Sequence, residues 1–330
     1  MDVLSEIVGK AGITERQRLE RVLSQQEAAV RSAFLEFLAD VRSPAVLREV
    51  RRLLEASNVG GALRIVDSHV LRLGSVVPRL YQSVGSQALI ALSAILRPDA
   101  AGRALNFDQT AALAVEMMRR NQLEFVGDMT RSQREATRQA LVEAQARGWG
   151  TERTARAFRD SIGLTQTQRA AVANYRRLLE LGDRTALDRL LRDRRFDSSV
   201  ERSIEEGVPL GGERIQRMVE AYERRMRQSR AETIARTEGL RATGQAQRLA
   251  LLQAIDGLGI SPQRVVRVWR STLDNRTRDT HSAMDGQRRG LEEPFVSPSG
   301  ARLMYPGDSS APASEVINCR CVVQTQILSV

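Results

Sequence analysis

The sequence has very little lysine, cysteine, histidine or aromatic residue. Lys10 is the only lysine among 50 basic residues, cysteine and histidine occur twice each, and aromatic residues make up 4% of the 330 positions. Two cysteines exclude a small scaffold held by disulfides. Because hydrophobic residues still amount to 42%, Leu, Val, Ala and Ile must fill the core, which favours packed helices over β-sandwiches.

The sequence also lacks the signatures of several enzyme classes. It contains no Gly-x-Ser-x-Gly nucleophile elbow, no phosphate-binding glycine-rich loop with its lysine and no helix with paired metal-binding histidines. A histidine base could only be His69 or His281. Since His69 lies beside Val66 and Val70 in an apolar helical stretch, we expect a half-buried packing role for it.

Membrane and export signals are missing as well. Met1–Glu6 has neither a basic flank nor an apolar run, so it does not resemble a signal peptide. The longest apolar stretch, Ala88–Leu96, is too short to cross a bilayer. The sequence predicts synthesis and folding in the cytoplasm, with no membrane partner.

The net charge of +10 comes from arginine and is unevenly distributed. Residues 131–230 hold 22 basic and 15 acidic residues, an excess of 7, whereas the segments before and after them are nearly balanced. A GC-rich coding genome would account for arginine in place of lysine, and the planar guanidinium also suits phosphate. We expect a salt-bridged helix surface with weak, sequence-independent attraction to polyanions such as DNA.

Helical periodicity dominates the first 250 residues. Apolar residues recur at spacings of three and four, as in Val30, Phe34, Phe37 and Val41. A long helix should run from Glu213 towards Ala246. We predict helix breaks or starts at Ser43-Pro44, Asn58–Gly61, Arg97–Asp99, Gly148–Thr151 with Thr151 as the cap, Gly163, Thr165 and Gly207–Gly212.

The pattern changes near the C-terminus. Val265–Trp269 is β-branched and aromatic, which predicts a strand, and a turn-rich segment follows it as far as Cys321–Val323. The predicted fold class is mainly α, with a helical N-terminal region followed by a small α+β C-terminal domain. The expected segments are 1–145 (helical), 146–230 (Arg-rich, helical) and 231–330 (α+β).

Six short motifs follow one another in this last segment. They are Ile234–Glu238 with Ala242 and Ala246, then Trp269, then Leu273–His281, then Met284–Gln287, then Tyr305–Asp308 and Asn318–Cys321. In this order and spacing they resemble the Mu F-like, or head-morphogenesis, family of phage minor head proteins. The motif residues are Arg236, Glu238, Trp269, Asp274, Arg276, Arg278, His281, Gly286, Asn318, Cys319, Arg320 and Cys321.

The resemblance implies a low-copy structural protein of a tailed bacteriophage. Such a protein would act in head assembly and in DNA packaging or delivery, inside the capsid near the portal vertex. The expected partners are the portal protein, the major capsid or scaffolding protein, and packaged DNA. Residues 1–145 would then be the region that docks on portal or capsid.

Two cysteines and a histidine suggest a zinc site. Cys319 and Cys321, two apart on a strand, would present both thiols on one face, and Asp274 and His281 lie in a turn-rich segment that could fold against it. The alternative is that the thiols are small buried hydrophobes and that His281 hydrogen-bonds Asp274 or Asp279. No cofactor is certain from the sequence, and zinc is a hypothesis.

The charged turn before His281 also has two interpretations. Arg276 and Arg278 could pair with phosphate or a protein partner. Alternatively, Asp274 accepts backbone N–H bonds and an arginine closes the turn. We favour the second interpretation.

Some members of this broad family are described as similar to ADP-ribosyltransferases. Such enzymes use an arginine, a serine or threonine on a strand, and a late glutamate. Here Arg236 and Glu238 share one helical turn, which is more typical of a salt-bridge or packing pair. A virion-delivered enzyme is therefore the alternative function, and non-specific DNA binding is another.

Overall fold

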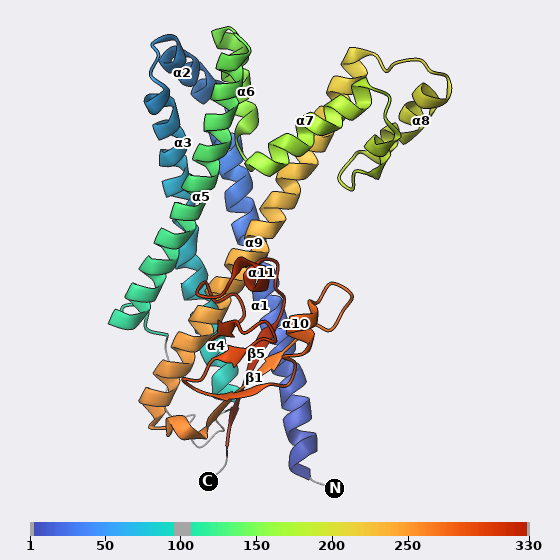
Figure 1. The fold of residues 1–330 in the computed structure, drawn as a ribbon. Coiled ribbons are helices and arrows are strands. Elements are labelled where there is room, and N and C mark those ends of the chain that lie inside the picture. The colour runs from blue at the N-terminus through green and yellow to red at the C-terminus, as the bar shows by residue number, and fades with distance from the viewer. Residues whose placement is uncertain (1–2, 96–106, 329–330) are drawn as a thin grey trace. The chain divides into compact units, whose positions relative to one another are not determined.

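The computed structural model describes residues 3–95 and 107–328 and is 68% helical. Helices occupy the N-terminal two thirds, and short strands appear only near the C-terminus (Figure 1). The predicted fold class is confirmed. The α-helices are α1 (Val3–Val41), α2 (Pro44–Glu55), α3 (Val59–Leu73), α4 (Val76–Ile95), α5 (Ala112–Ala146), α6 (Thr151–Ser161), α7 (Gln166–Glu180), α8 (Asp197–Glu205), α9 (Gly212–Leu258), α10 (Asp279–Ser282) and α11 (Ala313–Val316).

Local capping chemistry sets several helix ends. Ser43 accepts a hydrogen bond from Val46 N at 3.4 Å and Pro44 opens α2, so this predicted break is confirmed. Thr165 caps α7 in a reciprocal capping box with Gln168. Gly163, at φ +84°, follows the end of α6. The break predicted at 97–99 lies outside the described residues.

One predicted cap is wrong. Gly150 occupies the N-cap position of α6 and no side chain caps that end, while Thr151 is already the first helical residue. The Thr154 hydroxyl, one turn further on, bonds the carbonyl of Gly150 at 3.1 Å. Gly150 lacks a side-chain acceptor, so the first amides of this helix have no side-chain cap.

The C-terminal region contains two small antiparallel sheets. In the first, β1 (Val265–Arg270) lies between β2 (Arg288–Gly290) and β5 (Val322–Ile327), with Arg267 opposite Arg289 on one side and Thr325 on the other. In the second, β3 (Phe295–Val296) pairs with β4 (Arg302–Leu303). The predicted strand at 265–269 is thus confirmed as the central strand of three.

The chain forms two compact units, neither of them continuous in sequence. One comprises residues 1–33, 74–125 and 233–330, and the other comprises 34–73 and 126–232. In the first unit the strand residue Val265 packs with Ala88 of α4 and with Ala250 and Ile255 of α9. The C-terminal strands therefore share their core with helices from the N-terminal third.

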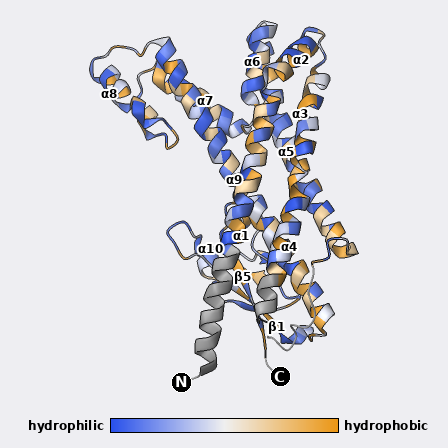
Figure 2. Ribbon diagram, turned by 180° about the vertical axis from the view of Figure 1, so that it is seen from behind, coloured by the Kyte–Doolittle hydropathy of each residue, from blue (hydrophilic) through white to orange (hydrophobic). Residues whose placement is uncertain are grey.

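The second unit has its own core. Tyr175 of α7 stacks at 4.5 Å on Tyr222 of α9, and Met218 and Leu179 are buried beside them. Apolar and polar residues alternate along the helices, which gives them the banded appearance of Figure 2. Among the described residues, no helix is both long and apolar enough to cross a membrane.

Candidate metal centre

Three buried side chains of the first unit converge next to β1. His281 on α10 places its Nδ1 3.4 Å from Cys319 Sγ and 3.5 Å from Cys321 Sγ. All three residues are 1–2% exposed, and one ligand atom from each lies within 4.8 Å of the others. The structure therefore brings together His281, Cys319 and Cys321, as the sequence suggested.

The cysteines are not in a strand, however. Both lie in the irregular segment between α11 and β5, and Asn318 before them adopts a left-handed conformation with φ +59°. Asparagine tolerates that region because its side chain bonds locally. The thiols share a side because this segment curls, with Cys321 N 3.4 Å from Cys319 Sγ, and not because of strand alternation.

Helix α9 holds the cysteine segment in this conformation through contacts with Asn318. Arg236 donates to the Asn318 side chain at 3.2 Å, and the Thr237 hydroxyl accepts from Asn318 N at 3.2 Å. Arg236 also lies 3.8 Å from a carboxylate oxygen of Glu27. Glu238 pairs with Arg241 at 3.0 Å on the same helix. Arg236 and Glu238 thus contact different partners, since residues two apart on a helix do not face each other.

Trp269 supports the imidazole from the sheet. It is fully buried on β1, and its ring meets that of His281 edge-on at 5.4 Å and that of Phe295 at 5.3 Å. Its backbone carbonyl accepts from Gly286 N at 2.9 Å, where φ is +76° and glycine is favoured. The motif residues Trp269 and Gly286 therefore hold the α10 segment against the sheet.

Asp274, the fourth ligand suggested by the sequence, is bound elsewhere. Both of its carboxylate oxygens accept hydrogen bonds at 2.5 Å from Arg320, the residue between the two cysteines. Its Oδ1 also accepts from Arg276 N and from the Thr277 hydroxyl. These bonds, chiefly those from Arg320, hold the pKa of Asp274 far below its usual range.

The charged turn therefore folds on itself. Arg278 donates to the carbonyl of Ile317, so it ties the turn to the cysteine segment. Arg276 is largely exposed and lies 4.0 Å from Asp274. The geometry matches the interpretation in which Asp274 organises the turn and arginines close it.

Glu315 is the site residue that sequence reasoning missed. It lies on α11, is 4% exposed, and places Oε2 3.0 Å from His281 Nε2, where we had expected Asp274 or Asp279. Burial alone would raise its pKa, but bonds from Ser299 and Thr280 and the proximity of His281 lower it overall. The one sequence signal for Glu315 was a carboxylate beside apolar residues in the short helix Ala313–Val316.

The two thiols differ electrostatically. Hydrogen bonding with Cys319 and with His281 outweighs burial and lowers the pKa of the Cys321 thiol, whereas the same pairing and burial raise the pKa of Cys319. Both cysteines are free. Cysteine sulfur and histidine nitrogen are ligand types that zinc accepts.

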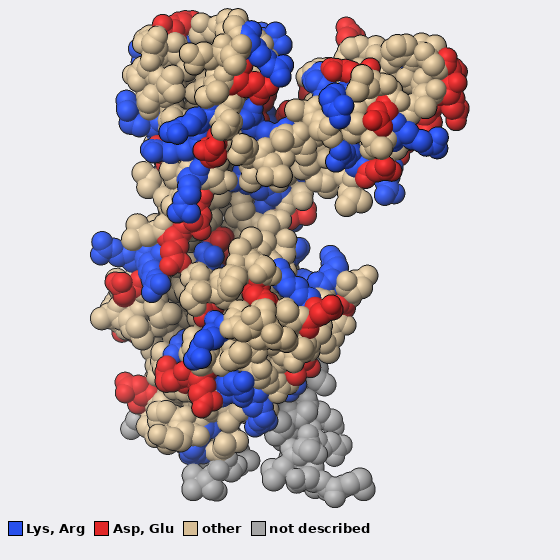
Figure 3. Space-filling view, in the orientation of Figure 1, with Lys and Arg blue, Asp and Glu red and all other residues tan. Residues whose placement is uncertain are grey.

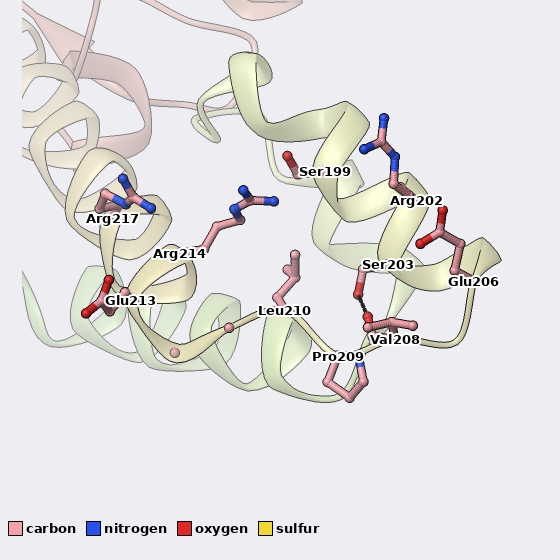
Figure 4. Close-up of a pocket in the computed structure, with 12 residues that line it drawn as sticks. Ser199, Arg202, Ser203, Glu206, Val208, Pro209, Leu210, Glu213, Arg214 and Arg217 are labelled. Carbon is pink, nitrogen blue, oxygen red and sulfur yellow. Dashed lines mark hydrogen bonds between the residues drawn. The ribbon is translucent and has the colours of Figure 1, made fainter.

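A hollow of about 510 Å³ lies in the second unit, between α8 and the start of α9. Figure 4 shows Arg202, Arg214 and Arg217 around it together with Glu206 and Glu213. All five are exposed. Water and the neighbouring carboxylates thus solvate the guanidinium groups, which makes this a weaker candidate site than the buried cluster.

The Arg-rich segment is extensively ion-paired, as expected. Basic and acidic side chains are interspersed over the face shown in Figure 3. Asp193, 3% exposed, holds both Arg195 and Arg225. Further pairs with arginines of residues 131–230 are Arg131–Asp128, Arg134–Asp67, Arg147–Glu143, Arg156–Glu152, Arg159–Asp160, Arg169–Glu143, Arg176–Glu180, Arg192–Asp197 and Arg227–Glu223.

Comparison with known proteins places the C-terminal region in a recognised class. Residues 198–324, which include the cluster and all the sheet strands except the last part of β5, match the family model described as Phage Mu protein F like protein. The resemblance seen in the motifs is confirmed, and the match begins upstream of 231, within the α8 segment.

A curated relative agrees with this. The minor head protein GP7 of Bacillus phage SPP1 is 28% identical over 128 residues, which are 38% of this chain and 39% of that protein. The match therefore spans well under half the length of the relative. No solved structure matches.

Proposed function

We propose that this protein is a structural minor head protein of a tailed bacteriophage that acts in head assembly and in DNA packaging or delivery near the portal vertex. The observation that carries the proposal is the Mu F-like match over residues 198–324, supported by similarity to a protein named as a minor head protein. The contacts of Arg236 and Glu238 within the packing of α9 favour a structural over an enzymatic role.

The proposed partners are the portal protein and the major capsid or scaffolding protein. We place the docking surface on the helices of residues 1–145, within the first unit at α5, where the large apolar side chains of Leu113 and Leu123 remain 53% and 63% exposed. Exposed leucines on helices are typical anchors for a partner helix or groove. Packaged DNA would be contacted non-specifically through the arginine excess, with binding that falls steeply as salt rises.

Co-expression with the cognate portal, capsid and scaffolding proteins, followed by affinity capture and size-exclusion chromatography, tests this function. Full-length chain is required, because the C-terminal strands share a core with Ala88 and α4. We expect a stable complex with at least one head protein, and detection of the chain in purified proheads or virions. Absence from both particles, with no complex, would overturn the proposal.

Point variants locate the docking surface. Leu113→Asp and Leu123→Asp should weaken the complex without changing the circular dichroism spectrum, because both side chains are exposed. Leu190→Asp is the matched control, since Leu190 is 87% exposed but lies outside residues 1–145. Equal loss of binding in all three variants would contradict the assignment of the docking surface to residues 1–145.

A further inference from the structure

Three of the best-buried polar or sulfur-bearing side chains of the C-terminal region meet at a point that head assembly does not explain. His281, Cys319 and Cys321 come from two segments 38 and 40 positions apart. Both thiols pack among apolar residues, including Trp269 and Met284, as small buried hydrophobes do. Apolar packing alone does not require that both also lie against the same nitrogen, His281 Nδ1.

The spacing of these atoms fits a tetrahedral ion. Zinc binds histidine nitrogen at about 2.0–2.1 Å and cysteine sulfur at about 2.3 Å, so a tetrahedral N–Zn–S pair is separated by about 3.5 Å. The two observed Nδ1 to Sγ distances are 3.4 and 3.5 Å. We propose that His281 Nδ1, Cys319 Sγ and Cys321 Sγ bind one zinc ion.

The far side of the imidazole provides an independent argument. Metal-ligating histidines almost always direct their other ring nitrogen at a carboxylate or carbonyl, which fixes the tautomer and the ring orientation. Glu315 lies on that side, with Oε2 3.0 Å from Nε2, a distance that allows an ion pair, although Nε2 makes no hydrogen bond to the described residues. Its carboxylate is itself held by Ser299 at 2.6 Å and Thr280 at 3.0 Å, so Glu315 is a positioning residue for the ligand.

Charge balance allows such a site to be buried. One Zn²⁺ and two thiolates sum to zero, so the cluster carries no net charge into the core, where an unpaired charge would be strongly disfavoured. A neutral water molecule would complete the coordination. Asp274 takes no part, since Arg320 holds both of its oxygens.

The ion would act as a crosslink. The region from α10 to β5 has only four-residue helices, short strands and turns. One metal bound by His281 and the two cysteines closes the 38-residue loop between them. Closing a loop of this kind stabilises the folded state, and zinc supplies binding energy directly to folding. The proposal does not depend on the head function.

Elemental analysis of full-length protein is the first test. The protein is purified without a metal-affinity step and without chelator, and zinc is quantified by mass spectrometry. We expect one zinc per chain. Chelated protein titrated with Co²⁺ should then develop the ligand-to-metal and d–d absorption bands of tetrahedral thiolate coordination, and Zn²⁺ should abolish them. A folded protein with neither zinc nor cobalt bands would overturn the proposal.

Variants identify the ligands. Cys319→Ser, Cys321→Ser and His281→Gln should each lose the metal, whereas Asp279→Asn, a change at an exposed carboxylate in the same turn, should keep it. Glu315→Gln should weaken zinc affinity by about 10–100-fold, as outer-shell changes do. Retention of stoichiometric zinc by both serine variants would refute the assignment. If those variants do not fold, the cobalt titration of the unmodified chain decides.

Discussion

Arg320 lies between the two cysteines in sequence and grips Asp274, 46 positions away, with two hydrogen bonds of 2.5 Å. One residue thus links the charged turn at 274–278 to the cysteine segment. Because two parallel N–H bonds need the planar guanidinium, lysine cannot replace it. The pair orders the backbone that presents Cys319 and Cys321.

We therefore predict that Arg320→Lys lowers the thermal unfolding midpoint of the full-length protein, with Asp274→Asn having a similar effect. The double variant should cost little more than either single variant, since both remove one interaction. Differential scanning fluorimetry measures this. Arg276→Lys is the control, because Arg276 is 73% exposed and lies 4.0 Å from Asp274. Full additivity of the two changes would contradict the coupling.

Gly244 lies where α9 meets the Tyr305–Asp308 motif. A Cβ at this position would lie 2.6 Å from the Tyr305 ring and 3.0 Å from the carbonyl oxygen of Pro306. We expect Gly244→Ala to destabilise the protein by about 1–3 kcal/mol, as overpacking does, despite the better helix propensity of alanine. Chemical denaturation would measure the change.

Gly127 provides the matched control. It also lies within a helix, α5, but a Cβ there would have no neighbour within 4 Å. Gly127→Ala should stabilise the protein by about 0.5–1 kcal/mol through helix propensity alone. The prediction fails if both alanine variants shift stability in the same direction by similar amounts.

Features set by local chemistry could be predicted from the sequence. Ser43-Pro44 and Thr165 mark helix starts because a capping oxygen acts on amides only two or three residues away. The proximity of His281 to the two cysteines was predicted only because histidine and cysteine are side chains that bind zinc. The reason given for it, strand alternation, was wrong.

Partners separated by long stretches of sequence could not be predicted. Asp274 was assigned to the metal because carboxylates can ligate zinc, yet it pairs with Arg320, since only the folded chain brings that guanidinium beside it. Glu315 was missed for the same reason, because its role depends on α11 docking against α10. Thr151 was predicted as the N-cap of α6, but Gly150 occupies that position. Sequence patterns locate a helix end only to within one or two residues.

Arg267 is a charged residue inside the central strand β1. Its side chain donates to the carbonyls of Gly290, Met304 and Glu293 and stacks 5.1 Å from the Phe295 ring. Burial lowers its pKa to about 10. The guanidinium thus satisfies carbonyls at the end of β2, in the loop between β2 and β3, and directly after β4.

Replacement of Arg267 by methionine should leave those carbonyls unpaired. We expect a loss of about 2–4 kcal/mol in unfolding free energy, the range for breaking a buried charged hydrogen-bond network. Arg302→Met is the control on β4, where the side chain is exposed. Urea denaturation followed by tryptophan fluorescence is suitable because Trp269 lies on the same strand. A loss no larger than that of the control would show that solvent replaces these bonds.

Asp193 makes stability of the second unit depend on acid pH. Hydrogen bonding from Arg195, with the nearby charge of Arg225, lowers its pKa to about 2. An unfolded aspartate titrates near about 3.9. Because the folded pKa is the lower one, the stabilisation is complete above about pH 4 and is lost as pH falls towards about 2.

Asp193→Asn should therefore lower the urea midpoint at neutral pH, and the gap to the unmodified protein should narrow between about pH 4 and pH 2 as protonation removes the same charge. Asp188→Asn, an exposed change in the same segment, controls for general effects of lost negative charge. A gap that stays constant down to pH 2 would mean that Asp193 stabilises the fold through its shape and neutral hydrogen bonds, and not through its charge.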